Sequence, residues 1–125
     1  MSLVLDTGAL LAVEWRHRAV LAKIRTAQME GVPVRTSSGA VSQVWRNGAR
    51  QALLATTLRG IEERPIDAAS SRRIGRVLAD TGTSDVVDAH VAVLCDDDSH
   101  LLTSDPGDLD HLLRVLGRSA TISRV

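Results

Sequence analysis

The chain has 125 residues, a length typical of one domain with its own core, and we expect a single domain over residues 1–125. The core must be aliphatic, because there is no Phe or Tyr and there are only two Trp. The single cysteine, Cys95, excludes an intrachain disulfide, and its place in an apolar run predicts a packed thiol. No signal peptide or long apolar span is recognisable, so we expect a cytoplasmic protein without a membrane segment.

Positive and negative charges balance overall but are segregated along the chain. Residues 1–79 carry 12 Lys and Arg against 6 Asp and Glu, whereas residues 80–125 carry 3 against 9. All but one of these cations are arginines, whose guanidinium groups suit bidentate contact with phosphate. The pattern is compatible with an acidic pocket rimmed by arginines that holds nucleic acid. It is equally compatible with solvated helix faces, so charge alone does not decide between them.

The first half of the chain alternates short apolar runs with amphipathic segments. Thr7 is the expected N-cap of the first helix, and Gly31 is placed to end the second. In chain order we expect a strand at 2–5, helices at 9–15 and 17–30, a strand at 32–36, helices at 39–46 and 50–58, and a short edge strand within 60–66.

The second half continues the alternation. Asp67 and Ser84 are the expected N-caps of its first two helices, and Pro106 is placed to begin the third. Strands that alternate with helices predict an α/β fold with a central, mainly parallel sheet and helices on both faces. The expected elements are helices at 68–79 and 86–95, a strand at 100–103, a helix at 106–116 and a strand at 120–125.

Two aspartates follow expected strands directly. Asp6 ends the run Leu3-Val4-Leu5, and Asp105 comes after the strand at 100–103. In parallel sheets, ligands bind beyond the carboxyl ends of the strands, at the point where the strand order reverses. We therefore expect both carboxylates to emerge at that edge.

Two more aspartates lie in a helix that is otherwise apolar. Asp85 and Asp88 are three residues apart, which places them on one face of the helix. A buried charge without a partner costs several kcal/mol, so these carboxylates need a reason to be there. A divalent cation supplies one, because clustered carboxylates otherwise repel each other and take up protons. Oxygen ligands of this kind suit Mg²⁺ or Mn²⁺, and such ions promote phosphodiester hydrolysis.

Three segments carry a resemblance. Residues 4–10 read VLDTGAL, residues 85–92 read DVVDAHVA, and residues 102–109 read LTSDPGDL. In this order and spacing, over essentially the whole chain, they resemble the PIN-domain family and, within it, the VapC-type toxins of bacterial toxin–antitoxin pairs. The resemblance implies a three-layer α/β/α sandwich and a Mg²⁺-dependent endoribonuclease. It also implies a small cognate antitoxin as partner and a homodimer.

The resemblance also assigns site residues. The acids of the family correspond to Asp6, Asp85 and Asp105, and Asp88 lies one turn beyond Asp85, where it could share or replace its role. These four aspartates are therefore the predicted catalytic and metal-ligating residues, with Mg²⁺ or Mn²⁺ as cofactor and RNA as substrate. In this class a metal-activated water hydrolyses the phosphodiester bond.

The chain departs from the family at one acid. A Glu is usual in the helix after the second strand, and here the corresponding residue is Gln43. An amide offers an oxygen but does not balance the charge of a metal ion. An alternative function is therefore a catalytically attenuated PIN-like protein that binds RNA or a partner. Arg46 and Arg50 are the best candidates to line an RNA path or to receive an antitoxin carboxylate.

The remaining polar residues have ordinary structural interpretations. Asp108 is expected as a first-turn helix acid, Asp96–Asp98 as a solvated turn, and His90 and His100 as packed or surface histidines. The class of phosphoacceptor receiver domains resembles a pattern with a paired acid after the first strand and a lysine after the last. Here only Asp6 follows the first strand, and the only lysine, Lys23, lies in an early helix. A dinucleotide site is not supported, because no glycine-rich loop follows the first strand.

Overall fold

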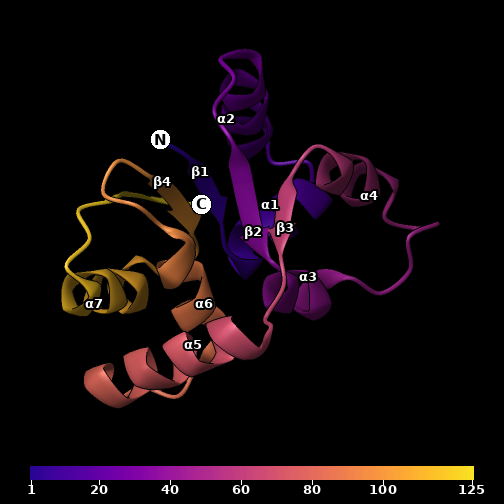
Figure 1. The fold of residues 1–125 in the computed structure, drawn as a ribbon. Coiled ribbons are helices and arrows are strands. Elements are labelled where there is room, and N and C mark those ends of the chain that lie inside the picture. Colours follow the sequence, from indigo (N-terminus) through magenta and orange to yellow (C-terminus); the bar gives the residue numbers. More distant parts are fainter.

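A computed structural model describes all of residues 1–125, and Figure 1 shows helices packed around a central sheet. All strand pairs are parallel, and the order in the sheet is β3-β2-β1-β4-β5. The expected α/β fold with a mainly parallel sheet is therefore confirmed. The strands are β1 (Leu3–Leu5), β2 (Val34–Ser37), β3 (Glu62–Arg64), β4 (His100–Thr103) and β5 (Thr121–Arg124).

Seven helices lie within one or two residues of their expected positions at most ends. None of them combines the length and apolar character that a helix needs to cross a bilayer. They are α1 (Thr7–Glu14), α2 (Arg18–Met29), α3 (Ser38–Val44), α4 (Ala52–Arg59), α5 (Ala68–Thr81), α6 (Val86–Leu94) and α7 (Pro106–Leu116).

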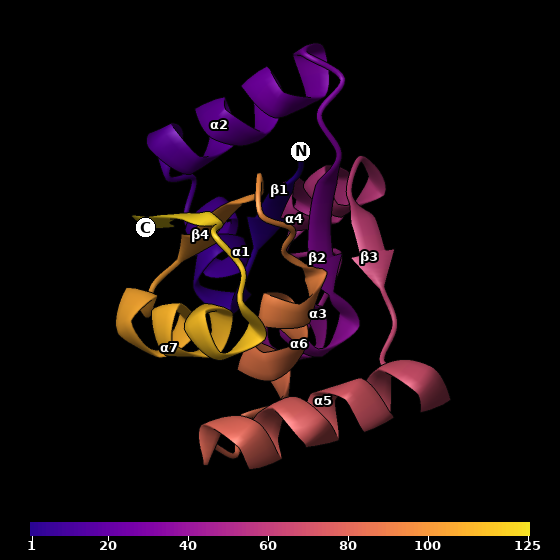
Figure 2. The same ribbon diagram turned by 60° about the vertical axis from the view of Figure 1, so that its left-hand side comes forward.

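The sheet separates two aliphatic cores, which makes the protein a three-layer α/β/α sandwich. Successive side chains of a strand point to opposite faces. Leu3 and Leu5 of β1 accordingly pack with α1, α2, α3 and α4, whereas Val4 packs with α5, α6 and α7. The two groups of helices are seen on opposite sides of the strands in Figures 1 and 2. Cys95 belongs to the second core as expected, and burial raises the pKa of its thiol to about 12.

Two helix caps differ from the expected ones, because an aspartate rather than a hydroxyl residue provides each of them. Asp6 has an extended backbone, and its Oδ1 accepts a hydrogen bond from the Ala9 N–H at 2.9 Å, which leaves Thr7 inside α1. Asp85 caps α6 in the same way, in place of Ser84. Both caps put a side-chain oxygen where it accepts a hydrogen bond from the first turn of a helix.

The corner between α1 and α2 has an unusual backbone. Arg16 has a φ of 59°, a left-handed conformation that glycine normally provides at the end of a helix. Two hydrogen bonds close the turn, from the Arg16 N–H to the Val13 carbonyl at 3.0 Å and from the His17 N–H to the Ala12 carbonyl at 2.8 Å. This pattern is a Schellman motif, and it fixes the position of Trp15 at the end of α1.

The sheet has two edges. At one of them, all three residues of β3 are exposed, and Glu62 accepts hydrogen bonds from the side chains of Arg35 and Arg64 at 2.9 and 3.1 Å. The other edge is β5, whose Ile122 and Ser123 are half-buried. The short edge strand expected within residues 60–66 is therefore confirmed.

Candidate metal centre

The strand order reverses between β1 and β4, so the crevice beyond their carboxyl ends is the expected ligand site. The two strands pair directly, with Leu5 opposite Leu102. Asp6 follows Leu5, and its N–H donates to the Leu102 carbonyl at 3.2 Å. Asp105 lies two residues beyond the end of β4, where α7 begins. Both aspartates therefore emerge at the edge that the sequence predicts.

Asp6 is the buried member of the site. Only 4% of the residue is exposed, and this burial raises the pKa of its carboxyl group. Hydrogen bonds from the Thr103 hydroxyl and from the N–H groups of Gly8, Ala9 and Ser104 act in the opposite direction, because they stabilise the carboxylate. The site thus holds a desolvated acid whose position is fixed by the turns after β1 and β4.

Asp88 lies in the first turn of α6 and is half-buried. Burial is the largest cause that raises its pKa to about 6. The negative charges of Asp85, Asp6, Asp105 and Asp108 raise it further, in that order. Five acidic side chains are therefore close enough to influence one another, although they come from three separate parts of the chain.

Three of these acids form the tightest group. One carboxylate oxygen from each of Asp88, Asp105 and Asp108 lies within 4.8 Å of the others. A hydrogen bond with Asp105 raises the pKa of Asp108, which shows how closely the two carboxyl groups approach. A donor set made only of carboxylate oxygens at this separation fits a hard divalent cation such as Mg²⁺ or Mn²⁺.

Asp108 is the site residue that the sequence interpretation missed. It is in the first turn of α7, as expected, but its carboxylate also joins the group of three. The signal was present, because Asp105 and Asp108 have the same three-residue spacing as Asp85 and Asp88. Two helices that begin at the same edge of the sheet each bring a pair of acids to it.

Asp85 lies at the rim of the site. It is exposed, and its Oδ1 accepts a hydrogen bond from the Asp88 N–H at 2.9 Å as the N-cap of α6. Asp85 and Asp6 are not members of the group within 4.8 Å, although their charges act on Asp88. The structure thus brings Asp88 and Asp105 together, and places Asp6 and Asp85 beside them.

Gln43 lies on α3, at the position where the resemblance predicted a Glu, and its side chain is exposed. Its Oε1 accepts a hydrogen bond from the Thr7 hydroxyl. Thr7 follows Asp6 in the sequence, so this bond ties the amide to the turn that carries the buried acid. Arg46 and Arg50 are also exposed, in the connection between α3 and α4.

The turns after β1 and β4 pack against each other at a glycine. A Cβ placed on Gly8 would lie 2.1 Å from Ser104 Oγ, 2.4 Å from Ser104 Cβ and 3.1 Å from the Ser104 main-chain nitrogen. No side chain fits at this position unless the Ser104 segment moves. Gly8 therefore sets the distance between the segments that hold Asp6 and Asp105.

We predict that Gly8→Ala destabilises the protein by about 1–3 kcal/mol, the usual effect of inserting a methyl group into a packed site. Denaturant unfolding measures the change. Gly75→Ala is the matched control, because Gly75 lies in α5 and a Cβ there meets nothing within 4 Å. Equal stability of the Gly8→Ala variant and the native protein would contradict the contact.

Structural contacts account for two histidines and for the acidic turn of the second half of the chain. His90 is buried and lies 2.6 Å from Ser37 Oγ through its Nδ1, and His100 lies 2.7 Å from Ser123 Oγ through its Nε2. Burial lowers the pKa of both imidazoles. Both histidines are packed groups, as expected. Asp96–Asp98 form the expected exposed turn, and Asp98 pairs with the Met1 amino group at 2.8 Å.

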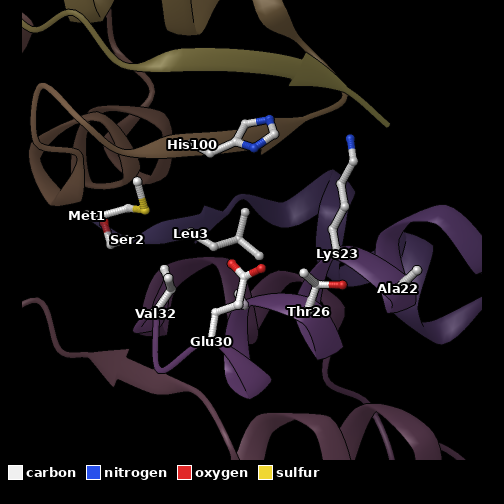
Figure 3. Close-up of a pocket in the computed structure, with 10 residues that line it drawn as sticks. Met1, Ser2, Leu3, Ala22, Lys23, Thr26, Glu30, Val32 and His100 are labelled. Carbon is white, nitrogen blue, oxygen red and sulfur yellow. The ribbon is translucent and has the colours of Figure 1, made fainter.

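A separate cavity of about 310 Å³ lies at the amino-terminal ends of β1 and β4, next to α2. Figure 3 shows Lys23, Glu30 and His100 among the side chains that line it, together with Leu3 and Val32. The cavity has side chains of both charges and is at the opposite end of the strands from the carboxylates. It is therefore not part of the candidate metal centre.

A five-stranded parallel sheet between two helical layers, with acids where the strand order reverses, defines a PIN-like α/β/α fold. Among solved structures, the chain is similar to a crystal structure of VapBC2 from Rickettsia felis bound to a DNA fragment from their promoter. The TM-score is 0.67 at 13% identity, over 100% of this chain and 99% of that chain. No protein-family model and no curated protein sequence matches the chain. The fold expected from the resemblance is confirmed at the level of structure.

Proposed function

We propose that this protein is a Mg²⁺-dependent endoribonuclease, the toxin component of a type II toxin–antitoxin module. The observation that carries the proposal is the set of carboxylates at the reversal point of a PIN-like sheet. Asp88, Asp105 and Asp108 would hold the metal ion, with Asp6 and Asp85 as neighbouring carboxylates. When bound, Mg²⁺ would neutralise charge on a phosphodiester and acidify a water molecule.

The side chains of the protein perform three tasks in this proposal. The first is to hold the cation by charge, since burial and then the negative charges of four neighbouring aspartates raise the pKa of Asp88, and a bound cation would offset both. The second is positioning, because Asp6 is buried and its Oδ1 accepts a hydrogen bond from the Ala9 N–H. The third task falls to the amide of Gln43. The hydrogen bond from the Thr7 hydroxyl holds this amide at the edge of the site, where it could orient a water or a ribose hydroxyl.

The partners of the protein belong to the same proposal. The structurally similar protein is a VapBC2 assembly with DNA, which supports a small antitoxin as partner of this chain. We propose RNA as the substrate and a homodimer as the functional form. Arg46 and Arg50 remain the proposed contacts for RNA phosphates or for an antitoxin carboxylate.

The test compares cleavage of structured RNA by the native protein and by Asp6→Asn, in Mg²⁺ or Mn²⁺. Asn is as good an N-cap as Asp, so α1 should keep its start in the variant. We expect a loss of about 100-fold or more in rate, since even supporting groups around a metal site contribute 10–100-fold.

Asp67→Asn is the matched control, because Asp67 caps α5 and has no contact with the site. It should cleave RNA at the native rate. Equal residual activity of native protein and Asp6→Asn would defeat the proposal.

A second candidate function is an attenuated PIN-like protein that binds RNA or a partner without efficient cleavage. The observation in its favour is Gln43, which contributes no charge to balance a metal ion. Restoration of the carboxylate separates the two functions, and the expected result is given in the Discussion.

A further inference from the structure

A groove of about 450 Å³ lies directly beside the candidate metal centre. Its walls are mostly apolar. They are formed by Leu11 and Ala12 of α1, by Trp15 directly after this helix, and by Val125 directly after β5. Gly8 and Ser104 also line it. We call this feature the Trp15 groove. Its volume lies in the range of pockets that hold small ligands.

The groove adjoins the two segments that carry Asp6 and Asp105. Gly8 is two residues after Asp6, and Ser104 is the residue before Asp105. Gly8 and Ser104 pack against each other, and both line the groove. A ligand whose reacting part lies at the metal centre could therefore extend a neighbouring part into the groove.

Trp15 is 74% exposed and is one of only two tryptophans in the chain. It follows Leu11 by four residues, so both side chains lie on the same face of α1. The Schellman turn through Arg16 and His17 holds the end of the helix in place. A large aromatic ring is thus kept in solvent next to a strongly polar site, although its burial would be favourable.

The charged residues near Trp15 indicate the kind of ligand that its ring binds. Arg16 and Arg18 follow Trp15 in the sequence and are exposed, and neither has a carboxylate within 4.0 Å. His17 lines the groove between them. Aromatic rings with nearby free guanidinium groups are the combination that binds single-stranded nucleic acid, by stacking on bases and by attraction of phosphates.

We propose that the Trp15 groove holds an unpaired nucleobase of the RNA strand, next to the phosphate at the metal centre, stacked on the Trp15 indole. Arg16 and Arg18 contact the neighbouring phosphates. This inference rests on the proposed function, since it assigns part of the substrate to a place beside the same site. The occupant is single-stranded, because a base inside a duplex does not present its face.

The test measures binding of labelled, unstructured oligoribonucleotides by fluorescence anisotropy in EDTA, so that no cleavage occurs. Trp15→Ala should weaken binding by about 5- to 150-fold, the range that stacking of one base supplies. Trp15→Phe should retain most of the affinity. Trp45→Ala is the matched control, because Trp45 is the other tryptophan, is 39% exposed and packs against Gly48 outside the groove.

A strand with abasic sites separates stacking from contact with the backbone. We expect the native protein to bind an abasic strand about as weakly as Trp15→Ala binds the normal one. In a Trp45→Phe background Trp15 is the only tryptophan, and its emission should be quenched when RNA binds. Unchanged affinity of Trp15→Ala, or an equal loss on normal and abasic strands, would overturn the proposal.

The arginines have a test of their own. Arg16→Gly keeps the left-handed turn, because glycine adopts a positive φ without strain. Combined with Arg18→Ala, it should reduce the slope of log affinity against log salt by about 0.7 for each arginine. Arg25→Ala on the exposed face of α2 should leave the slope unchanged. An unchanged slope in the double variant would count against the phosphate contacts and overturn that part of the proposal.

Failure of the groove and failure of the nuclease give different results. If cleavage depends on Asp6 but RNA binding does not depend on Trp15, only the proposal about the groove is overturned. Binding that depends on Trp15 without any cleavage overturns only the nuclease. If Trp15→Ala binds RNA normally but has a lower mass in light scattering, the groove is a contact between two copies of the chain and the base proposal is wrong.

Discussion

Asp88→Asn is expected to make the metal-free protein more stable at pH 7.5. The pKa of Asp88 is raised from 3.8 to about 6 in the folded protein, so ionisation is less favourable there than in the unfolded chain. The folded state therefore binds more protons than the unfolded state between about pH 4 and 6, and stability falls as the pH rises through this window. Asparagine removes the penalty, which we put at about 1–3 kcal/mol because the side chain is partly exposed.

Chemical denaturation at pH 4 and pH 7.5 in EDTA measures this effect. The gain of Asp88→Asn over the native protein should be present at pH 7.5 and nearly absent at pH 4. Asp80→Asn is the control, because Asp80 is an exposed acid of α5 without an ion pair. A stability gain of equal size at both pH values would show that the ionisation of Asp88 is not its cause.

Metal should offset the stability advantage of Asp88→Asn over the native protein. Addition of Mn²⁺ at 100 times its Kd should stabilise the native protein by about 2.7 kcal/mol, since the ion binds only the folded state. Asp88→Asn lacks one of the three closest carboxylates, so its gain should be much smaller. Thermal unfolding with and without Mn²⁺ gives both numbers, and equal gains in the two proteins would remove Asp88 from the metal site.

Gln43→Glu is expected to increase metal affinity and RNA cleavage, by about 10- to 100-fold, the range known for groups that support a metal site. The carboxylate can accept the hydrogen bond from Thr7 just as the amide oxygen does, so its position should be kept. It adds one negative charge next to Asp6, which a bound cation then balances. In the metal-free protein the same charge should raise the pKa of the neighbouring acids further.

The control for this change is Gln28→Glu, the same substitution on the exposed part of α2, with loss of one hydrogen bond to the Gly60 carbonyl. It should leave metal affinity and cleavage unchanged. A large gain with Gln43→Glu alone would show that the natural protein is attenuated. No gain would mean that Asp108 already supplies the missing carboxylate.

The sheet and the main acids could be predicted from local signals. Short apolar runs end at Asp6 and just before Asp105, and parallel strands bring their carboxyl ends to one edge. The α7 helix begins and ends as expected, because Pro106 and Gly117 mark its two ends. These features depend on residues that are neighbours in the sequence.

The parts that the sequence did not predict depend on contacts between distant segments. Whether Thr7 or Asp6 caps α1 depends on where the strand ends, which neighbouring strands decide. Asp108 joins the site only because α6 and α7 begin side by side. The Trp15 groove requires the end of β5 to lie against α1, more than 100 residues earlier in the chain. No periodicity within one element carries that information.

The composition of β3 has a consequence for assembly. A free strand edge invites another chain to extend the sheet, and charged side chains on that strand prevent it. Glu62, Glu63 and Arg64 place three charges along this short strand, and Arg35 adds a fourth from the strand beside it. Strand addition at this side, including amyloid-like stacking, is therefore opposed by the native sequence. We therefore expect copies of the protein to associate through helical surfaces or through the opposite edge strand, β5, which contains Ile122.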